Sequence, residues 1–154
     1  MNLTQRGCIP TNNSKYDCIR LENQLCFPIY AASREIVKRY RPFLDELDLT
    51  YTQYIAMMVF WEEKKINVKH LGEKLFLDSG TLTPVLKSLE AKGFVSRYRS
   101  KKDERILTVE ITPEGEALKE KAVEIPQKMA GCVNLNAEEA TQLHTLMHKI
   151  LGVK

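Results

Sequence analysis

Apolar side chains recur at helical spacing from about Leu21 to Tyr40, after a polar lead-in, and this pattern predicts an amphipathic helix. Pro28 lies in its early turns and should bend them, because proline has no backbone N–H to donate. Pro42 is expected to end the helix for the same reason.

Capping residues predict three more helices, of which the first two begin at Thr50 and Asn67. Thr50 and Gln53 form a capping box before the strongly apolar stretch LTYTQYIAMMVFWEE, which predicts a core helix to about Trp61. Asn67 can cap a short helix that runs through Leu75.

The stretch LDSGTLTPVLKSLEAKG predicts the next helix, with Asp78 or Ser79 at its start and Gly93 as its stop. Pro84 must then fall in or near the first turn, since deeper in a helix it would remove a hydrogen bond. Two short helices joined by a brief turn indicate a helix-turn-helix.

A β-hairpin follows, because FVSRYRSKKDERILTVEIT has the pattern of a strand, a polar turn and a second strand. On the return strand Leu107, Val109 and Ile111 should alternate inward. The tip carries three basic residues, Lys101, Lys102 and Arg105.

Two helices complete the pattern. Thr112 and Pro113 supply a cap and a proline at the first helical position of a long helix, which Pro126 should bend. A last helix starts behind Asn136, with acidic residues in its first turn, and runs to about Leu151. No repeat or linker interrupts this order, so we expect one mainly α domain.

Composition agrees with a folded protein. The chain has 154 residues, of which 44% are hydrophobic and 28% are charged, so it can bury a core. The sequence contains neither a run of apolar residues long enough for a membrane span nor a signal-peptide pattern. We therefore expect a cytoplasmic protein with no membrane partner.

The positive charge of the chain is concentrated. Between Lys87 and Arg105 lie seven basic residues and three acidic ones, while the formal net charge of the whole chain is only +3. A basic segment on a near-neutral body is typical of a protein that contacts phosphate. A merely solvated charged face would have the same composition.

The metal-binding residue types are present but not in metal-binding patterns. The four cysteines, Cys8, Cys18, Cys26 and Cys132, have no C-x-x-C spacing and are expected to be thiols. His144 and His148 are four residues apart, which is a ligand spacing, but no carboxylate or cysteine is evidently paired with them. We therefore expect no metal and no cofactor.

Cys26 and Tyr30 are also four residues apart and should share one face of the first helix. A free cysteine is usually a small buried hydrophobe. From these residues alone, Cys26 can be either core filling or a reactive thiol.

Four motifs carry a resemblance to a known family. They are NQLCF..Y..SRE (23–35), Y.P.L..L.LTY.QY (40–54), LDSGTLTP.LK.LE (77–90) and DER (103–105). With them the chain resembles the MarR family of dimeric winged-helix transcription regulators, and within it the organic hydroperoxide sensors of the OhrR type. The resemblance covers roughly residues 22–125.

The resemblance implies a redox role for Cys26 as the peroxide-sensing thiolate. The tyrosines that match those around the thiol are Tyr30, Tyr40 and Tyr51, some of which would act across the dimer interface. Thiolate attack on a peroxide O–O bond is reasonable chemistry, and phenols can donate hydrogen bonds to the sulfur. The expected effector is an organic hydroperoxide.

The resemblance also implies a homodimeric repressor of a pseudo-palindromic operator in double-stranded DNA. The residues expected in the major groove are Ser79, Thr81, Thr83 and Lys87. Arg105 would enter the minor groove with Asp103 holding its guanidinium. The expected layout is a winged helix-turn-helix with a β-hairpin wing, in one domain over 1–154: an arm (1–19), dimerisation helices (20–45 and 113–154) and a DNA-binding lobe (50–111).

Some relatives keep a second cysteine after the wing, which condenses with the oxidised thiol of the other subunit. Cys132 is the favoured match, and Cys18, Cys8 or a small thiol are the alternatives. Two other function classes also stay open. One is a MarR-type regulator released by a small aromatic or drug-like ligand, and the other is a thiol peroxidase, although we expect no enzyme.

Overall fold

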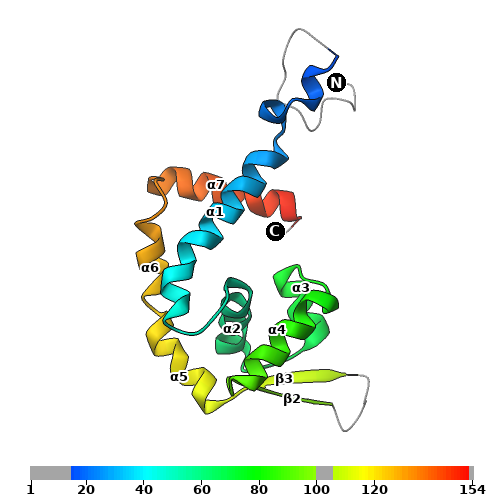
Figure 1. Cartoon of the computed structure of the whole chain (residues 1–154), viewed down its shortest axis with the longest axis vertical. Coiled ribbons are helices and arrows are strands. Elements are labelled where there is room, and N and C mark those ends of the chain that lie inside the picture. Colours follow the sequence, from blue (N-terminus) through cyan, green and yellow to red (C-terminus); the bar gives the residue numbers. More distant parts are fainter. Residues whose placement is uncertain (1–14, 100–105, 153–154) are drawn as a thin grey trace. The chain divides into compact units, whose positions relative to one another are not determined.

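The computed structural model describes residues 15–99 and 106–152. The chain divides into two compact units, Met1–Val123 and Glu124–Lys154. Figure 1 traces the elements of both units along the chain. The single domain over 1–154, with its arm, dimerisation helices and DNA-binding lobe, stays a prediction.

The first helix begins later than its apolar pattern predicts. Two 3-10 turns, η2 (Asp17–Ile19) and η3 (Leu21–Asn23), precede α1, which spans Cys26–Asp45. Asn23 is buried and its side-chain amide donates to the Asp17 carbonyl at 2.8 Å, which stabilises the turns instead of a helix. Pro28 lies in the first turn of α1, where a missing N–H leaves no helical hydrogen bond unmade.

The prediction that Pro42 ends this helix is wrong, because α1 continues past it to Asp45. Pro42 lies in the last turn, where it removes one hydrogen bond. Leu44, Leu47 and Leu49 just after it are buried. Burial of these three side chains outweighs the local preference of one proline.

Helix α2 (Tyr51–Glu63) is the central element of the first unit, and seven of its thirteen residues are buried. Its predicted capping box is confirmed, with the Gln53 N–H donating to Thr50 Oγ1 at 3.3 Å and the Thr50 N–H donating to Gln53 Oε1 at 2.9 Å. The Trp61 indole donates to the Gly115 carbonyl at 2.9 Å, which attaches α2 to the segment after the wing.

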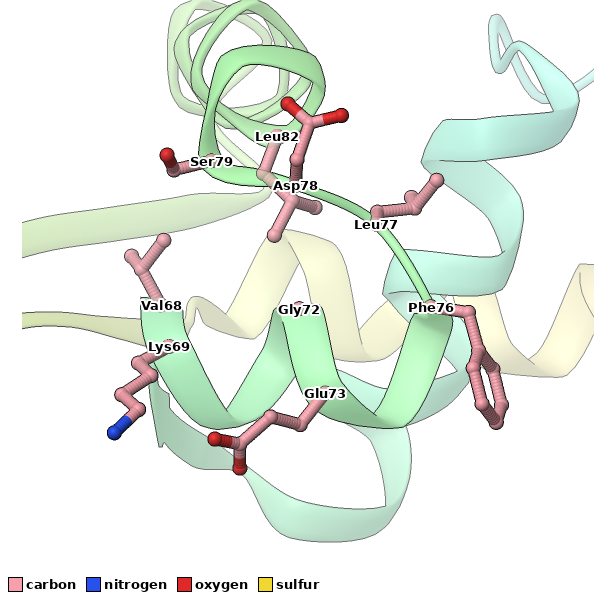
Figure 2. A pocket seen from close by; sticks show the side chains of 9 residues that line it. All are labelled: Val68, Lys69, Gly72, Glu73, Phe76, Leu77, Asp78, Ser79 and Leu82. Carbon is pink, nitrogen blue, oxygen red and sulfur yellow. The ribbon is translucent and has the colours of Figure 1, made fainter. Parts of the chain in front are cut away.

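The helix-turn-helix consists of α3 (Val68–Leu75) and α4 (Ser79–Ala91), capped by Asn67 and Asp78 as predicted. Figure 2 shows Gly72 of α3 facing the turn between the two helices. A Cβ on Gly72 would lie 2.7 Å from the Leu77 carbonyl oxygen, so the close approach of turn and helix requires glycine.

Pro84 lies deeper in α4 than predicted, inside the second turn. The N–H that it lacks would have paired with the carbonyl of Gly80, one helical turn earlier. The helix tolerates this loss because Leu82, Leu86 and Leu89 bury its inner face. Gly93, in the left-handed region at φ 76°, follows the helix end as expected.

The wing is part of a three-stranded antiparallel sheet of order β1-β3-β2. Its strands are β1 (Lys65–Asn67), β2 (Val95–Arg99) and β3 (Leu107–Ile111). Strand β3 is central, so Thr108 on one face and Val109 on the other are both buried, while Leu107 and Ile111 are half-buried. The simple inward alternation predicted for β3 is therefore only partly right, because β1 was not foreseen.

The long helix predicted after Thr112 is interrupted. Helix α5 spans Pro113–Ala122, Thr112 caps it as predicted, and a separate helix α6 spans Ile125–Ala130 with Pro126 in its first turn. Pro126 cannot donate to the carbonyl one turn earlier and its ring would clash there, so it starts a new helix instead of bending the old one.

The last helix, α7 (Ala137–Leu151), lies in the second unit and begins with a capping box of Asn136 and Glu139. None of its residues is buried in the single chain. Its exposed apolar side chains include Leu143, Leu146 and Ile150.

Candidate DNA-binding surface and thiol site

Helix α4 separates its residues cleanly between two faces. Leu82, Leu86 and Leu89 are at most 1% exposed and hold the helix on α2, α3 and the sheet. The opposite face is exposed and carries the four residues predicted to enter the major groove, Ser79, Thr81, Thr83 and Lys87. Figure 1 shows α4 in the first unit beside α3 and the β2–β3 hairpin.

The hydroxyl groups on this face are oriented by local hydrogen bonds. Thr81 Oγ1 donates to Asp78 Oδ2 at 3.0 Å, and Thr83 Oγ1 donates to the Ser79 carbonyl at 2.6 Å. The Thr81 N–H also donates to Asp78, and these bonds hold the pKa of the Asp78 carboxyl below its usual value. The threonine oxygens keep lone pairs that can accept from DNA bases or bridging waters.

Part of the basic segment is used inside the protein. Arg97 of β2 donates hydrogen bonds to the Glu90 carboxylate of α4 from both its guanidinium and its backbone N–H. The Arg97 Nε lies 2.9 Å from Glu90 Oε2. These hydrogen bonds lower the pKa of Glu90. Lys92 pairs with Asp48 at 3.1 Å. Charge counting alone could not distinguish these structural cations from Lys87, which is exposed on α4 and predicted to contact DNA.

The tip of the wing, with Lys101, Lys102, Asp103 and Arg105, lies outside the described residues. The minor-groove contact of Arg105 and its support by Asp103 therefore stay predictions. In the described part of the wing, β2 is attached to α4 through the Arg97–Glu90 pair and to β3 through the strand ladder.

A groove also runs between the two helices of the helix-turn-helix. It has a volume of about 580 Å³, and its lining includes Val68, Lys69, Glu73 and Phe76 (Figure 2). The Phe76 side chain is exposed and its backbone is left-handed at φ 54°, which shows how tightly the chain turns here.

The Cys26 thiol is exposed and is free in the structure. Cys26 is the first residue of α1, at the helix end whose unpaired N–H groups favour negative charge. Tyr30, one turn later, is 58% exposed, and its hydroxyl accepts from Arg34 at 3.1 Å. Core filling is thereby excluded for Cys26 within the single chain.

An open groove of about 510 Å³ lies along the same part of α1. Its lining combines apolar with charged groups, namely Phe27, Tyr30, Ala31, Arg34, Glu35 and Lys38. The groove begins at Phe27, the residue after Cys26, and three of its six lining residues are charged.

The other two predicted tyrosines form a separate cluster. The ring of Tyr40 lies 5.0 Å from that of Tyr51 and 5.9 Å from that of Tyr54, which sequence reasoning did not single out. Burial raises the pKa of all three phenols, and for Tyr40 and Tyr54 the neighbouring phenols add to the shift. They are therefore neutral at physiological pH and able to donate hydrogen bonds.

This cluster cannot reach Cys26 of its own chain. Tyr40 and Cys26 lie on the same straight run of α1, and at about 1.5 Å per residue their backbones are roughly 21 Å apart. The structure thus brings Tyr40 and Tyr51 together and keeps Tyr30 next to Cys26, but it does not unite the two groups in one protomer.

The remaining cysteines that the structure describes are reduced. Cys132 is half-buried just after α6, and its thiol donates to the Lys128 carbonyl at 3.4 Å. Cys18 is exposed, with its thiol 3.2 Å from the Lys15 carbonyl oxygen. Cys8 lies outside the described residues.

Two further features of the described ranges are their metal-ligating side chains and the apolar character of their helices. No group of three or more metal-ligating side chains occurs among residues 15–99 and 106–152. His148 Nδ1 lies 2.9 Å from the His144 carbonyl oxygen, and the two rings are 4.0 Å apart. Over the same residues, no helix has the length and apolar character needed to span a bilayer.

Comparison with known proteins identifies the family. Residues 38–122 match the family model described as transcriptional regulator SarA/Rot. The chain is 47% identical to the organic hydroperoxide resistance transcriptional regulator of Bacillus subtilis, over 90% of this chain and 94% of that protein.

Solved structures agree with this result. AbfR is a protein of Staphylococcus epidermidis. The structure of reduced AbfR bound to DNA is 32% identical in sequence to this chain, with a TM-score of 0.77, over 90% of this chain and 95% of that one. A disulfide form of AbfR is 38% identical with a TM-score of 0.61, over 88% and 96% of the two chains.

The fold and the comparisons together define a winged-helix transcription regulator, and the chain belongs to the MarR family. Within that family it falls in the OhrR-type branch, with the Bacillus subtilis regulator as a near relative. The predicted family and fold class are confirmed, and the helix-turn-helix and wing lie where their motifs placed them.

Proposed function

We propose that this protein is a dimeric DNA-binding repressor that senses organic hydroperoxides through Cys26 and then releases its operator. The observation that carries the proposal is the exposed Cys26 thiol at the start of α1 in a chain closely similar to an organic hydroperoxide resistance regulator. Its place of action would be the cytoplasm, where operator DNA lies.

The chemical step is a two-electron oxidation of sulfur. The Cys26 thiolate attacks one oxygen of the hydroperoxide, an S–O bond forms and the O–O bond breaks. The leaving alkoxide takes up a proton and departs as the alcohol, and Cys26 becomes a sulfenic acid. The cysteine supplies the electrons, so no cofactor is needed, and because nothing in the proposal regenerates the thiol in each cycle, we infer a sensor and not an enzyme.

We further propose that the thiolate is supported from two protomers. Tyr30 of the same chain is one turn from Cys26, whereas Tyr40 and Tyr51 are too distant along α1 to serve their own Cys26. A partner whose α1 runs in the opposite direction would bring its Tyr40 and Tyr51 to this sulfur.

Exposed apolar side chains support the dimer. Helix α1 is exposed along most of its length, including Phe27 and Val37, and α7 exposes Leu143, Leu146 and Ile150. Exposed apolar residues at helical spacing, such as the three on α7, are typical of surfaces that a second copy covers.

DNA binding is assigned to the exposed face of α4 and to the wing. Ser79, Thr81 and Thr83 offer hydroxyl groups and Lys87 a cation, which suits contacts with base edges and phosphates in the major groove. Arg105, supported by Asp103, is proposed to enter the minor groove. Two-fold symmetry then requires a pseudo-palindromic site with half-sites about one helical turn apart.

For the fate of the sulfenic acid we propose condensation with Cys132 of the other subunit, which releases water and forms a disulfide. The existence of a disulfide-formed structure of AbfR, a relative of this chain, supports this proposal. A covalent dimer on non-reducing gels that disappears in Cys132→Ser would support this, and one lost only in Cys18→Ser would assign the step to Cys18. Absence of any covalent dimer would indicate a small thiol.

A gel-shift titration tests the proposed function. The probe is a duplex selected from random-sequence DNA with the reduced protein, and the oxidant is cumene hydroperoxide. Wild type should release the duplex as Cys26 gains oxygen, whereas Cys26→Ser should bind equally well and stay bound. Release of Cys26→Ser by the oxidant would contradict the proposal. Release by aromatic compounds alone would point to a ligand-responsive regulator, and catalytic consumption of peroxide would indicate a peroxidase.

A further inference from the structure

We propose that a set of polar contacts between the start of α2 and the C-terminal half of α4 transmits the redox signal to the DNA-binding helix. The set consists of Asp48, Gln53, Ser88 and Lys92, here called the α2–α4 latch. The proposal rests on the proposed function for the origin of the signal, and it assigns Gln53, Ser88 and Lys92 as positioning residues for operator release.

Gln53 is the centre of the latch. Its side chain is 5% exposed, and it is one of only three buried polar residues in the described part of the chain. Its Nε2 donates to Ser88 Oγ at 2.9 Å, and its Oε1 accepts from the Thr50 N–H at 2.9 Å. A buried amide is costly to leave unpaired, so the first turn of α2 and the side of α4 at Ser88 are held together.

Lys92 adds a second attachment at the end of α4. Its ammonium pairs with the Asp48 carboxylate at 3.1 Å, donates to the Asp48 carbonyl, and lies 3.4 Å from Gln53 Oε1. Asp48 belongs to the connection between α1 and α2, and its backbone is left-handed at φ 52°. The C-cap residue of α4 is thus tied to the segment that follows α1.

The latch connects two functional regions. Tyr51, the first residue of α2, packs on Tyr40 of α1 at 5.0 Å and precedes Gln53 by half a turn. Ser88 directly follows Lys87 on α4. A displacement of the tyrosine cluster would therefore move the turn that carries Gln53, and through Ser88 it would rotate the exposed face of α4.

The apolar contacts of α4 are less suited to this task. Leu82, Leu86 and Leu89 keep the helix on the core, but dispersion and hydrophobic contacts are not directional. Hydrogen bonds weaken steeply when their angle changes, so they define the rotation of α4 about its axis. Loss of the latch should leave α4 folded while reducing its response to oxidation.

The experiment compares Ser88→Ala and Lys92→Met with wild type in the full-length protein. For each variant, duplex affinity is measured in the reduced form and after cumene hydroperoxide, and mass spectrometry follows Cys26 oxidation in parallel. The ratio of the two dissociation constants measures the coupling between sites. We expect unchanged Cys26 oxidation and a ratio about fivefold smaller, which corresponds to the loss of one typical hydrogen bond.

Two further variants separate transmission from stability. Thr50→Ala removes the capping hydroxyl of α2 but keeps the Gln53–Ser88 bond, so it should lower the melting temperature and leave the ratio as in wild type. Ser88→Thr keeps a hydroxyl and should restore the ratio.

Each other outcome has a distinct meaning. Equal ratios in wild type, Ser88→Ala and Lys92→Met would overturn the latch and leave the proposed function intact, because a purely structural role shifts both affinities equally. A slower Cys26 oxidation with an unchanged ratio would also overturn it. Wild-type protein that is oxidised at Cys26 without losing DNA affinity would overturn the proposed function itself, and the latch with it.

Discussion

The part of the chain that carries α2, α3, α4 and the wing, here called the lobe, buries many of its side chains, whereas helix α1 buries almost none. In the lobe, α2 and α4 bury their apolar faces. Hydrogen bonds within the same chain join β2 to α4 and α2 to α5. Along α1, only Leu44 is buried, and Cys26, Phe27 and Tyr30 face outward. The lobe thus buries its core within one protomer, while our proposal for the thiol site requires a second one.

Core truncation in the lobe should have the largest effect. Leu86→Ala removes a side chain that is 1% exposed, so it should lower the free energy of unfolding by about 3 kcal/mol. The effect should not depend on protein concentration, because no partner is needed to bury Leu86. Chemical denaturation at two protein concentrations checks this.

Leu146→Ala on α7 is the matched truncation in a region with no partner in the single chain. Its side chain is 55% exposed, so the same change should mainly weaken dimerisation. Sedimentation equilibrium should show a larger monomer fraction for this variant than for wild type. If Leu146→Ala destabilised the protein as much as Leu86→Ala at all concentrations, the contrast between the two regions would fail.

A smaller effect is expected where the wing meets α5. A Cβ on Gly115 would lie 2.1 Å from the Phe94 carbonyl oxygen, so Gly115→Ala should separate the two segments and cost about 2 kcal/mol. It should also weaken DNA binding, since the wing follows Phe94. Gly131→Ala is the control, because its Cβ would be no nearer than 3.6 Å to the Lys128 carbonyl oxygen. Thermal melting of both variants checks this prediction. If Gly115→Ala and Gly131→Ala lowered the melting temperature equally, the prediction would be wrong.

The smallest effect concerns the cap of α4 and depends on pH. The pKa of Asp78 is lowered by the hydrogen bonds from Thr81, so its contribution to stability is present above the ordinary carboxyl pKa and is lost as the pH falls through the lowered value. Asp78→Asn keeps a capping oxygen without a titrating group. Its melting temperature should therefore fall less than that of wild type between pH 5 and about pH 3. If the melting temperatures of the two proteins fell equally over this pH range, Asp78 would not be the titrating group.

The helix caps of this protein are predictable from the sequence, whereas features that depend on distant residues are not. Each predicted helix cap is present, because a cap depends on residues within one turn; these caps are Thr50, Asn67, Asp78, Thr112 and Asn136. The prediction that Pro42 ends α1 fails because the burial of later leucines outweighs the helix-breaking effect of proline. The sequence predicts no strand at β1 because three residues are too few to show a periodicity.

The candidate site was predictable to a different extent. Family motifs located Cys26, the tyrosines and the exposed face of α4, and the structure adds which of them lie together. Gln53 and Ser88 are 35 positions apart, so their hydrogen bond had no signal in the sequence. Likewise, only the length of α1 reveals that Tyr40 is too far from Cys26 of its own chain.

Mixed dimers test the central claim, that each thiol site is built from two protomers. One subunit carries Cys26 with Tyr40→Phe and Tyr51→Phe, and its partner carries Cys26→Ser with intact tyrosines. The rate of Cys26 oxidation by cumene hydroperoxide in this dimer should equal that of a dimer whose only change is one Cys26→Ser. When the tyrosine substitutions are moved to the Cys26→Ser subunit, oxidation should slow markedly. The reverse pattern, with slow oxidation only when the substitutions share a chain with Cys26, would contradict the account.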